Sequence, residues 1–573
     1  MKRLRVALLA VFSVAFFVSM AQGYVRAGIK WATDRVLPTD RIMACIDENL
    51  RGIGPSNDYP ITIAFNRLGN DPQDRQTRTI DDSLRELFES GPSGGTLRLI
   101  SIPCALIKSG GDVARNQQAA ASRAQSVAHR IGADIVVWGE VRARGDTLDL
   151  HFTHAEGVAA DQYTVEEYAL GLAFDQALGT IVAAKAVGLA HSAAEDRGRF
   201  FVPLMESVLA VTTPLANDPP RGLPPLQHGH LFEAHARVQD KLGTQAGRNS
   251  YLIDAIQFYK RALEVYGDAG DEWHAARTRN NLANALAVHG ERMGDAVVLG
   301  RAIDIYREAL VVRTQFRDPL AWAATQNNLG NALQIMGEWQ GDSDVLREAV
   351  TALELALAER TQTRMPVDWA ATKNNLGYAL QTLGELTEDP ELLRGAIRIY
   401  QQALVVRNRG QLPIAWAATQ NNLGNAQQLL GRLTKDEQAL RSAIAAYENA
   451  LTERRREIMP FAWASTKNNL GRALTTLGEL TADRRTIDGA ISAYEQALTI
   501  RQRDGQLIAW AATQKNWAKA EVVVFHLDGD SARLESAQAR AEEARSAFRE
   551  ANLGCYAQRA EALLTEIANA RGH

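Results

Sequence analysis

Along most of the chain, apolar side chains recur at the spacing of one face of a helix. One such stripe, with steps of three or four residues between its members, holds Trp322, Thr325, Leu329, Leu333 and Met336. The stripe returns at a constant step of 47 residues, marked by Leu282, Leu329, Leu376, Leu423 and Leu470. A period in this range predicts a solenoid of stacked units.

Each unit is predicted to contain two helices. The first is expected to begin at a proline, at Pro319, Pro366, Pro413 and Pro460. It is expected to end at a glycine with positive φ, at Gly337, Gly384, Gly431 and Gly478. The second helix is expected to begin after an N-cap aspartate, at Asp342, Asp389, Asp436 and Asp483. Its last turn is expected to carry a solvated arginine that favours the helix dipole, at Arg360, Arg407, Arg454 and Arg501.

These motifs resemble the tetratricopeptide repeat, in a long variant similar to kinesin light chain and related bacterial repeat proteins. The Leu-Gly pair of the family is matched at Leu329-Gly330, and its small-aromatic-small pattern at Ala396, Tyr400 and Ala403. The units are longer than the usual length of about 34 residues. The resemblance implies a mainly α fold, with a right-handed solenoid of about seven helix pairs over 229–553 and a capping helix over 554–573.

Residues 24–212 do not repeat, and strand and helix patterns alternate along them. Strands are predicted at 61–65, 97–102, 134–141 and 148–153, and helices at 79–88 and 116–131. This order indicates a small α/β domain whose sheet is partly parallel. Over roughly 58–155 it resembles the domain at the front of TolB, which implies a partner-docking module without catalysis. Several prolines predict a linker at 213–228, where neither helix nor strand continues.

The first 23 residues carry the pattern of an export signal. Three basic residues precede an apolar run over 6–18, and a small-x-small site follows at 19–21. A cleaved signal peptide and an uncleaved signal-anchor helix both fit this pattern. Either one predicts an exported protein, periplasmic or anchored in the inner membrane and facing the periplasm. In that compartment Cys45 and Cys104 are candidates for a disulfide, which leaves Cys555 free.

Charge and motifs argue against several classes of function. A net charge of −4 with 23% charged residues marks neither a nucleic-acid binder nor a disordered tail. The chain has no phosphate-binding Gly-x4-Gly-Lys motif, no Gly-x-Ser-x-Gly and no His-Glu-x2-His. His151 and His154, at the end of a strand, are interpreted as surface residues on opposite faces. We therefore expect a protein that is not an enzyme and has no cofactor, no metal and no nucleic-acid partner.

An asparagine occupies the same place in six of the first helices. The six residues are Asn281, Asn328, Asn375, Asn422, Asn469 and Asn516. Because asparagine is a mediocre helix former, its repetition needs a reason. The place resembles the asparagine ladder of O-GlcNAc transferase, which implies amides that pair with a peptide backbone on the concave face. The alternative is that the amides bond neighbouring helices and fix the geometry of the repeat.

Two further sets of side chains accompany the asparagines. The position three residues after each asparagine differs between units, and it holds Asn331, Tyr378, Asn425 and Arg472. Such variation is expected of residues that select between peptides, and equally of an unconstrained surface. The tryptophans lie on the apolar stripe and are expected to pack between units, at Trp322, Trp369, Trp416, Trp463 and Trp510.

These observations favour a non-enzymatic protein-interaction scaffold of the bacterial cell envelope. It is expected to bind an extended peptide or a partner protein in the concave groove of the solenoid. The alternative is a ligand-sensing or enzyme-accessory protein, whose α/β domain binds a small molecule or an envelope component. A polar pocket within residues 24–212 would favour that alternative.

Overall fold

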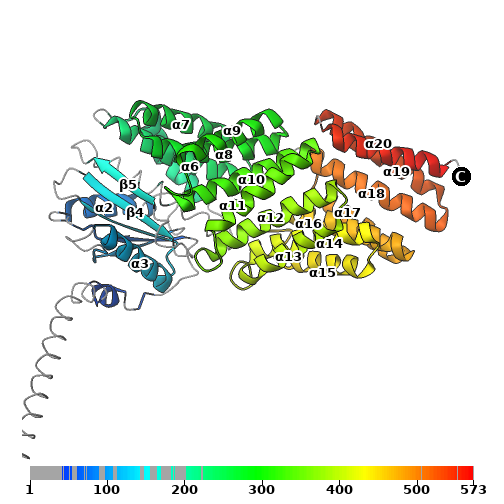
Figure 1. The fold of residues 1–573 in the computed structure, drawn as a ribbon, viewed down its shortest axis with the longest axis horizontal. Coiled ribbons are helices and arrows are strands. Elements are labelled where there is room, and N and C mark those ends of the chain that lie inside the picture. The colour runs from blue at the N-terminus through cyan, green and yellow to red at the C-terminus, as the bar shows by residue number, and fades with distance from the viewer. Residues whose placement is uncertain are drawn as a thin grey trace, which may run out of the picture.

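The computed structural model describes most of the chain after residue 41 (Figure 1). The described residues are 42, 44–50, 52–53, 61–69, 71, 74–89, 97–106, 113–141, 147–154, 164–169, 182, 184, 186, 202–220, 223–504, 506–551 and 553–571. The predicted signal segment, residues 1–23, lies outside them. Within the part described, no helix is both long and apolar enough to cross a membrane.

The α/β part contains one five-stranded sheet with the strand order β2-β1-β3-β4-β5. Its strands are β1 Ile61–Asn66, β2 Leu97–Ile102, β3 Ile135–Val141, β4 Thr147–His154 and β5 Thr164–Ala169. β1 pairs in parallel with β2 and β3, whereas β4 is antiparallel to both β3 and β5. The four predicted strands and the partly parallel sheet are therefore confirmed. β5 was not predicted, because the two glutamates in its Thr-Val-Glu-Glu-Tyr-Ala sequence interrupt the apolar alternation.

Helices cover both faces of this sheet. One face packs on α3 (Val113–Ile131), with Ile100, Ala124 and Trp138 in a shared core. The other face packs on α2 (Arg75–Glu89), through Ile80 and Leu84. Cys45 and Cys104 are joined by a disulfide, with their Cα atoms 6.0 Å apart. The bond ties a short helical segment at 44–49 to the chain that follows β2.

His151 is buried, so its interpretation as a surface residue is wrong. Its side chain has no exposed area and stacks on Trp138, the residue paired with it across β3 and β4, at 4.0 Å between ring centroids. Burial lowers the pKa of His151 to about 3, so the ring is neutral at physiological pH. The prediction failed because α3 covers the face of the sheet on which His151 lies.

The two parts of the chain share a core. α5 (Val202–Asn217) and α6 (Pro225–Ala246) contribute Met205, Val208 and Leu231 to the cluster that contains Ile63 and Leu150 of the sheet. α5 runs through Pro214 and ends one turn later, so the expectation that no helix continues past 213 is wrong. The first solenoid helix is therefore also a layer of the α/β part.

Residues 225–571 form seven helix pairs and a final helix (Figure 1). The first helices of the pairs are α6, α8 (Glu272–Met293), α10 (Pro319–Gln340), α12 (Pro366–Leu386), α14 (Pro413–Thr434), α16 (Pro460–Thr481) and α18 (Leu507–Asp528). The second helices are α7 (Asn249–Asp268), α9 (Ala296–Val312), α11 (Ser343–Glu359), α13 (Pro390–Val406), α15 (Glu437–Glu453), α17 (Arg484–Leu498) and α19 (Ser531–Glu550). The final helix is α20 (Gly554–Arg571). The α-solenoid preceded by a small α/β domain is thus confirmed.

Helix starts follow the sequence, but the ends of the first helices do not. The predicted prolines lie in the first turn of α10, α12, α14 and α16, and the predicted aspartates cap α11, α13, α15 and α17. Gly337 and its equivalents, however, lie inside the first helices. A Cβ on Gly337 would stand 2.8 Å from Cγ of Leu346, so this glycine permits close packing of the second helix. The left-handed cap of α10 is Gly341 instead.

The arginines after the second helices are buried, or half-buried in the case of Arg454, rather than solvated. In each unit the guanidinium donates through Nη1 to a threonine hydroxyl of the next first helix. The pairs are Arg313–Thr325, Arg360–Thr372, Arg407–Thr419, Arg454–Thr466 and Arg501–Thr513. The arginine therefore joins one unit to the next. Its position at a helix end in the sequence does not indicate this role.

The inner face of the helical array as the candidate functional site

The first helices define the inner side of the array. Neighbouring first helices contact one another, whereas the described contacts between neighbouring second helices are fewer. The second helices carry the most exposed apolar side chains of the pairs, such as Val297, Val311 and Val405. Elements that lie closer together occupy the shorter, concave path of a curved array. We call the solvent-facing side of α8, α10, α12, α14, α16 and α18 the inner face.

Asparagine amides form a hydrogen-bonded chain along this inner face. The amide of Asn328 donates to Oδ1 of Asn280 in the preceding unit at 3.3 Å, and Asn327 donates to Asn328 at 3.2 Å. The same link between units recurs for Asn375–Asn327, Asn422–Asn374, Asn469–Asn421 and Asn516–Asn468. At its start the chain reaches the buried carboxylate of Glu233, through the amide of Asn281.

These bonds give the predicted peptide-binding asparagines a structural role. Asn328 and its equivalents are half-buried, while Asn327 is 7% exposed. Each linked amide donates one of its N–H groups to the neighbouring unit, and it has a second N–H group. The structure thus fits the alternative in which the amides fix the geometry of the repeat. Contact with a peptide stays a prediction for Asn281, Asn328, Asn375, Asn422, Asn469 and Asn516.

The side chains at the variable positions beside the asparagines form hydrogen bonds with neighbouring helices. Tyr378 donates its hydroxyl proton to Glu338 at 3.3 Å, and Arg472 donates to Gln428 at 3.1 Å. Asn425 accepts a hydrogen bond from Tyr447 at 2.7 Å. All are half-buried, as is Asn331. The variable set therefore offers three kinds of polar group along the array, an amide at Asn331 and Asn425, a phenol at Tyr378 and a guanidinium at Arg472.

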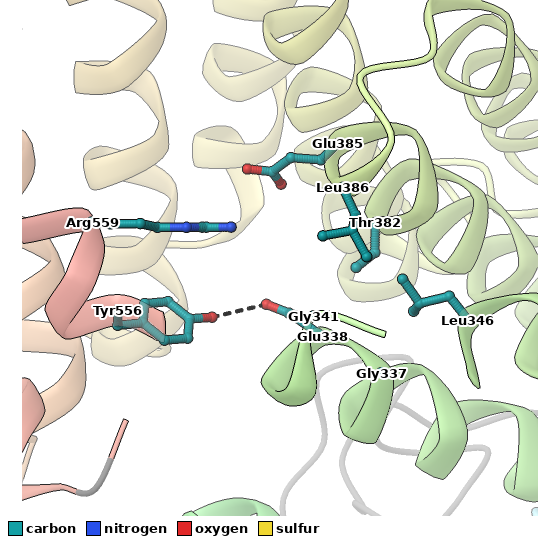
Figure 2. Close-up of a pocket in the computed structure, with 9 residues that line it drawn as sticks. All are labelled: Gly337, Glu338, Gly341, Leu346, Thr382, Glu385, Leu386, Tyr556 and Arg559. Atoms are coloured by element: carbon teal, nitrogen blue, oxygen red, sulfur yellow. Dashed lines mark hydrogen bonds between the residues drawn. The ribbon is translucent and has the colours of Figure 1, made fainter. Parts of the chain in front are cut away.

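The C-terminal helix returns to this face and encloses part of it. Tyr556 of α20 donates to Oε1 of Glu338 on α10 at 3.1 Å, across 218 residues of sequence. Figure 2 shows Tyr556 and Arg559 of α20 opposite Thr382, Glu385 and Leu386 of α12. A small pocket, partly open to solvent, lies between them. The pocket is lined by residues of α10, α11 and α12, which follow one another in the sequence, and of the distant α20.

Glu338 is the most heavily bonded acid of this pocket. It accepts hydrogen bonds from Tyr556, Tyr378 and Gln334. The pKa of Glu338 is raised above its ordinary value, mainly by burial and also by the charge of Glu385. The three hydrogen bonds oppose this shift but do not cancel it. The same place in the preceding first helix holds Glu291, and in the following one Glu385. These three glutamates, one per unit, were not predicted, although they follow the 47-residue step.

The tryptophans lie at one edge of the array. Trp322 is 9% exposed, while Trp369 and its later equivalents are half-buried. The later tryptophans have a basic side chain over the ring, such as Arg456 at 5.6 Å from Trp463 and Lys373 at 5.7 Å from Trp369. Such cation–π contacts account for the partly exposed rings without a ligand.

The inner face carries polar groups that can bind a partner. In the residues that the structure describes, no group of three or more His, Cys, Asp or Glu side chains is arranged to hold a metal ion. The inner face instead offers amides, hydroxyls and charges on a rigid helical array. None of the residues that line the pocket belongs to the described strands and helices of the α/β part.

Stacked helix pairs around a continuous core define the chain as an α-solenoid. The family model of the tetratricopeptide repeat matches residues 322–358 and 369–408, which cover most of two adjacent pairs, α10 with α11 and α12 with α13. These two stretches are therefore tetratricopeptide repeats, and repeats of this kind support a protein-interaction scaffold. The resemblance of 58–155 to the TolB domain stays a prediction.

Comparison with solved structures returns other helical repeat proteins. The apo form of RapI is 12% identical, with a TM-score of 0.38, over 68% of this chain and 97% of that one. A Rap protein complexed with competence and sporulation factor is 11% identical, with a TM-score of 0.37, over 69% and 98%. The TPR2AB domain of yeast Sti1, in a complex with pHSP90, is 19% identical, with a TM-score of 0.18, over 50% and 99%. TM-scores this low are not evidence about the function of this chain. No curated protein matches the chain.

Proposed function

We propose that the protein is a scaffold of the bacterial cell envelope that binds an extended segment of a partner protein along its inner face. The observation that carries the proposal is the row of half-buried polar residues of three kinds at one position of successive first helices, Asn331, Tyr378, Asn425 and Arg472. A row with one such group per unit suits an extended peptide that passes several units. Amide donors of the adjacent ladder add sequence-independent partners for a peptide backbone.

The test places a photo-crosslinking residue on each side of one helix pair. Tyr378 on α12 is replaced by p-benzoylphenylalanine, an aromatic of related shape, and Val405 on α13, which is 68% exposed, is the outer-face control. After irradiation of cells, the expected result is a crosslinked partner from position 378 alone. Overlapping synthetic peptides of that partner then locate the bound segment. Equal crosslinking from both positions, or from 405 alone, would contradict the proposal.

The envelope location is a separate part of the proposal. It rests on the basic and apolar pattern of the first 23 residues and on the oxidised pair Cys45–Cys104, since disulfides persist mainly in oxidising compartments. A β-lactamase domain fused after residue 571 is expected to confer ampicillin resistance on a bacterial host. The same fusion lacking residues 1–23 is the control and is expected to stay sensitive. A sensitive host with the full fusion at normal expression would count against export.

A further inference from the structure

The two edges of the helical array carry opposite charge. Because the helices of a pair run antiparallel, the connections from a second helix to the next first helix all lie at one edge. From α9 to α18 these five connections hold eleven arginines and three acidic residues, in 313–318, 360–365, 407–412, 454–459 and 499–504. From α8 to α19 the six connections at the other edge hold seven acidic residues and one lysine, in 294–295, 341–342, 387–389, 435–436, 482–483 and 529–530. We call the first edge the basic edge and the second the acidic edge.

Large apolar side chains are exposed at the basic edge. Phe461, in the first turn of α16, is 62% exposed, and Ile458, in the connection before it, is 46% exposed. Three arginines are exposed in the same connection and in the preceding one, Arg409, Arg455 and Arg456. Single exposed apolar residues are common on proteins, but two of them among several guanidinium groups mark an interaction surface. We call these five residues the edge patch.

Contacts between side chains hold the two connections of the edge patch together. Nε of Arg409 donates to Glu453 of the following unit at 2.6 Å. The guanidinium of Arg409 also lies over the ring of Trp416, at 5.7 Å from the centroid, and that of Arg456 lies over Trp463 at 5.6 Å. Both tryptophans are half-buried. The edge patch is therefore one continuous surface, built from arginines and aromatic rings of neighbouring units.

The edge patch has more positive than negative charge. Residues 407–412 and 453–459 together hold five arginines and two glutamates. One of these acids is paired with Arg409, and the other is exposed at Glu457. Within the part of the chain that the structure describes, no ion pair includes Arg455 or Arg456. Their charge is therefore available to an anionic partner.

Such a surface is complementary to the headgroup region of an anionic bilayer. Guanidinium groups attract the phosphates and stay at the level of the headgroups, while exposed apolar side chains enter the acyl boundary. We propose that the edge patch docks the helical array on an anionic phospholipid membrane, with Phe461 and Ile458 inserted. The inference goes beyond the proposed function, because it concerns the basic edge and leaves the inner face open to a partner protein.

The exposed apolar residues favour a membrane over other anionic partners. A nucleic acid or an acidic protein would pair with the arginines, but neither offers a hydrocarbon layer for Ile458 and Phe461. Phe316, at the tip of another connection of the basic edge, is 99% exposed beside the exposed Arg317 and extends the same chemistry. The acidic edge gives the docking a direction, since an anionic surface attracts one edge and repels the other. This separation lets a protein with a net charge of −4 bind a surface of the same sign.

The test reads insertion at one residue of the purified full-length protein. In a Cys555→Ser background, Phe461→Cys carries the environment-sensitive fluorophore NBD, and the Cys45–Cys104 disulfide is kept by omitting reductant. Val297→Cys, at a position that is 75% exposed at the acidic edge, carries the same label as the control. Vesicles contain phosphatidylcholine alone or with about one third phosphatidylglycerol. We expect stronger, blue-shifted emission from position 461 with phosphatidylglycerol only, and no change from position 297.

Because each label reports its own surroundings, membrane attachment through residues 1–23 does not reproduce this difference. Arg455→Gln is expected to weaken binding to the anionic vesicles about fivefold, and Arg455→Gln with Arg456→Gln about thirtyfold, the usual effect of one and two arginines near such a surface. Arg441→Gln removes an exposed arginine of α15 outside the edge patch and is expected to change the affinity by less than about twofold. Circular-dichroism melts of all labelled proteins come first. If losing the contact of Arg456 with Trp463 lowers the melt, Arg455→Gln alone decides the matter.

Four results would overturn the membrane proposal. The first is unchanged emission from position 461 with phosphatidylglycerol, and the second is an equal change from position 297. The third is an affinity that the arginine variants do not alter. The fourth is octaglutamate or an eight-nucleotide oligothymidylate that changes the emission from position 461 as strongly, with the same sensitivity to the variants. Crosslinking from position 378 depends on none of these results, so the proposed function and this inference fail separately.

Discussion

Single atoms decide how closely the two helices of a unit approach. Gly424 lies against the buried ring of Tyr447, and a Cβ at this position would stand 2.8 Å from Cε1 of that ring. We expect Gly424→Ala to lower the stability of the solenoid by about 1–3 kcal/mol, the usual cost of overpacking. A Cβ at Gly395 in α13 would only touch the flexible end of Arg398, at 3.9 Å, and the same change there is expected to stabilise the protein by about 0.5–1 kcal/mol. Urea midpoints followed by circular dichroism at 222 nm compare the two, and equal effects would contradict this account.

The buried histidine of the sheet makes the α/β part sensitive to acid. The pKa of His151 is about 3 in the native state and near 6.5 in an unfolded chain. Above pH 6.5 neither state is protonated, and the unfolding free energy does not depend on this group. Between pH 6.5 and 3 the unfolded state alone binds the proton, so stability falls by up to about 1.4 kcal/mol per pH unit.

Hydrogen exchange of peptides covering β3 and β4, corrected for intrinsic rates, is expected to show protection falling from pH 6.5 to 5. Because His235 in α6 also has a pKa lowered by burial, to about 4, the readout must be local to the sheet. His151→Phe keeps an aromatic ring against Trp138 and removes the proton site. It is expected to flatten the dependence, and an unchanged slope in this variant would assign the acid sensitivity to another group.

At the scale of helices, neighbouring units are joined by polar links as well as by their core. Asn421 is 7% exposed, donates to Asn422 and accepts from Asn469 of the next unit. Asn421→Ala leaves the half-buried amide of Asn469 without this acceptor, and the expected cost is about 1–2 kcal/mol. Asn449, exposed on α15, is the control, and its replacement by alanine is expected to be neutral or slightly stabilising. Thermal melts of both variants test this, and matching melting temperatures would show that the ladder adds no stability.

The sequence predicted elements far better than the links between them. Periodic leucines, first-turn prolines and N-cap aspartates located the helices of 296–498 closely, because those signals are local. The arginine at each second-helix end and the glycine inside each first helix were misjudged. Their roles depend on a threonine twelve residues later and on a leucine of the facing helix, such as Thr372 and Leu346. Local patterns carry no information about which helix a side chain meets in space.

At the scale of the whole molecule, the return of α20 to α10 follows from the curvature of the array. No motif encodes this contact, since small rotations between units add up over the 218 residues between Glu338 and Tyr556. The pocket exists only because α20 comes back to α10 (Figure 1). The sequence therefore predicted an inner face but not the helix that encloses part of it.

The contact between Tyr556 and Glu338 is expected to hold this enclosure. Tyr556→Phe removes the hydroxyl that donates to Glu338 but keeps the ring, so the secondary structure should not change. Spin labels are placed at two exposed residues, Gln340 at the end of α10 and Ala562 on α20. They report the distance between these two helices. Cys555→Ser removes the cysteine outside the Cys45–Cys104 disulfide before labelling. We expect one narrow distance distribution in the parent protein and a broader, longer one in Tyr556→Phe. Identical distributions would mean that helix packing alone sets the curvature, and the closing hydrogen bond would then have no mechanical role.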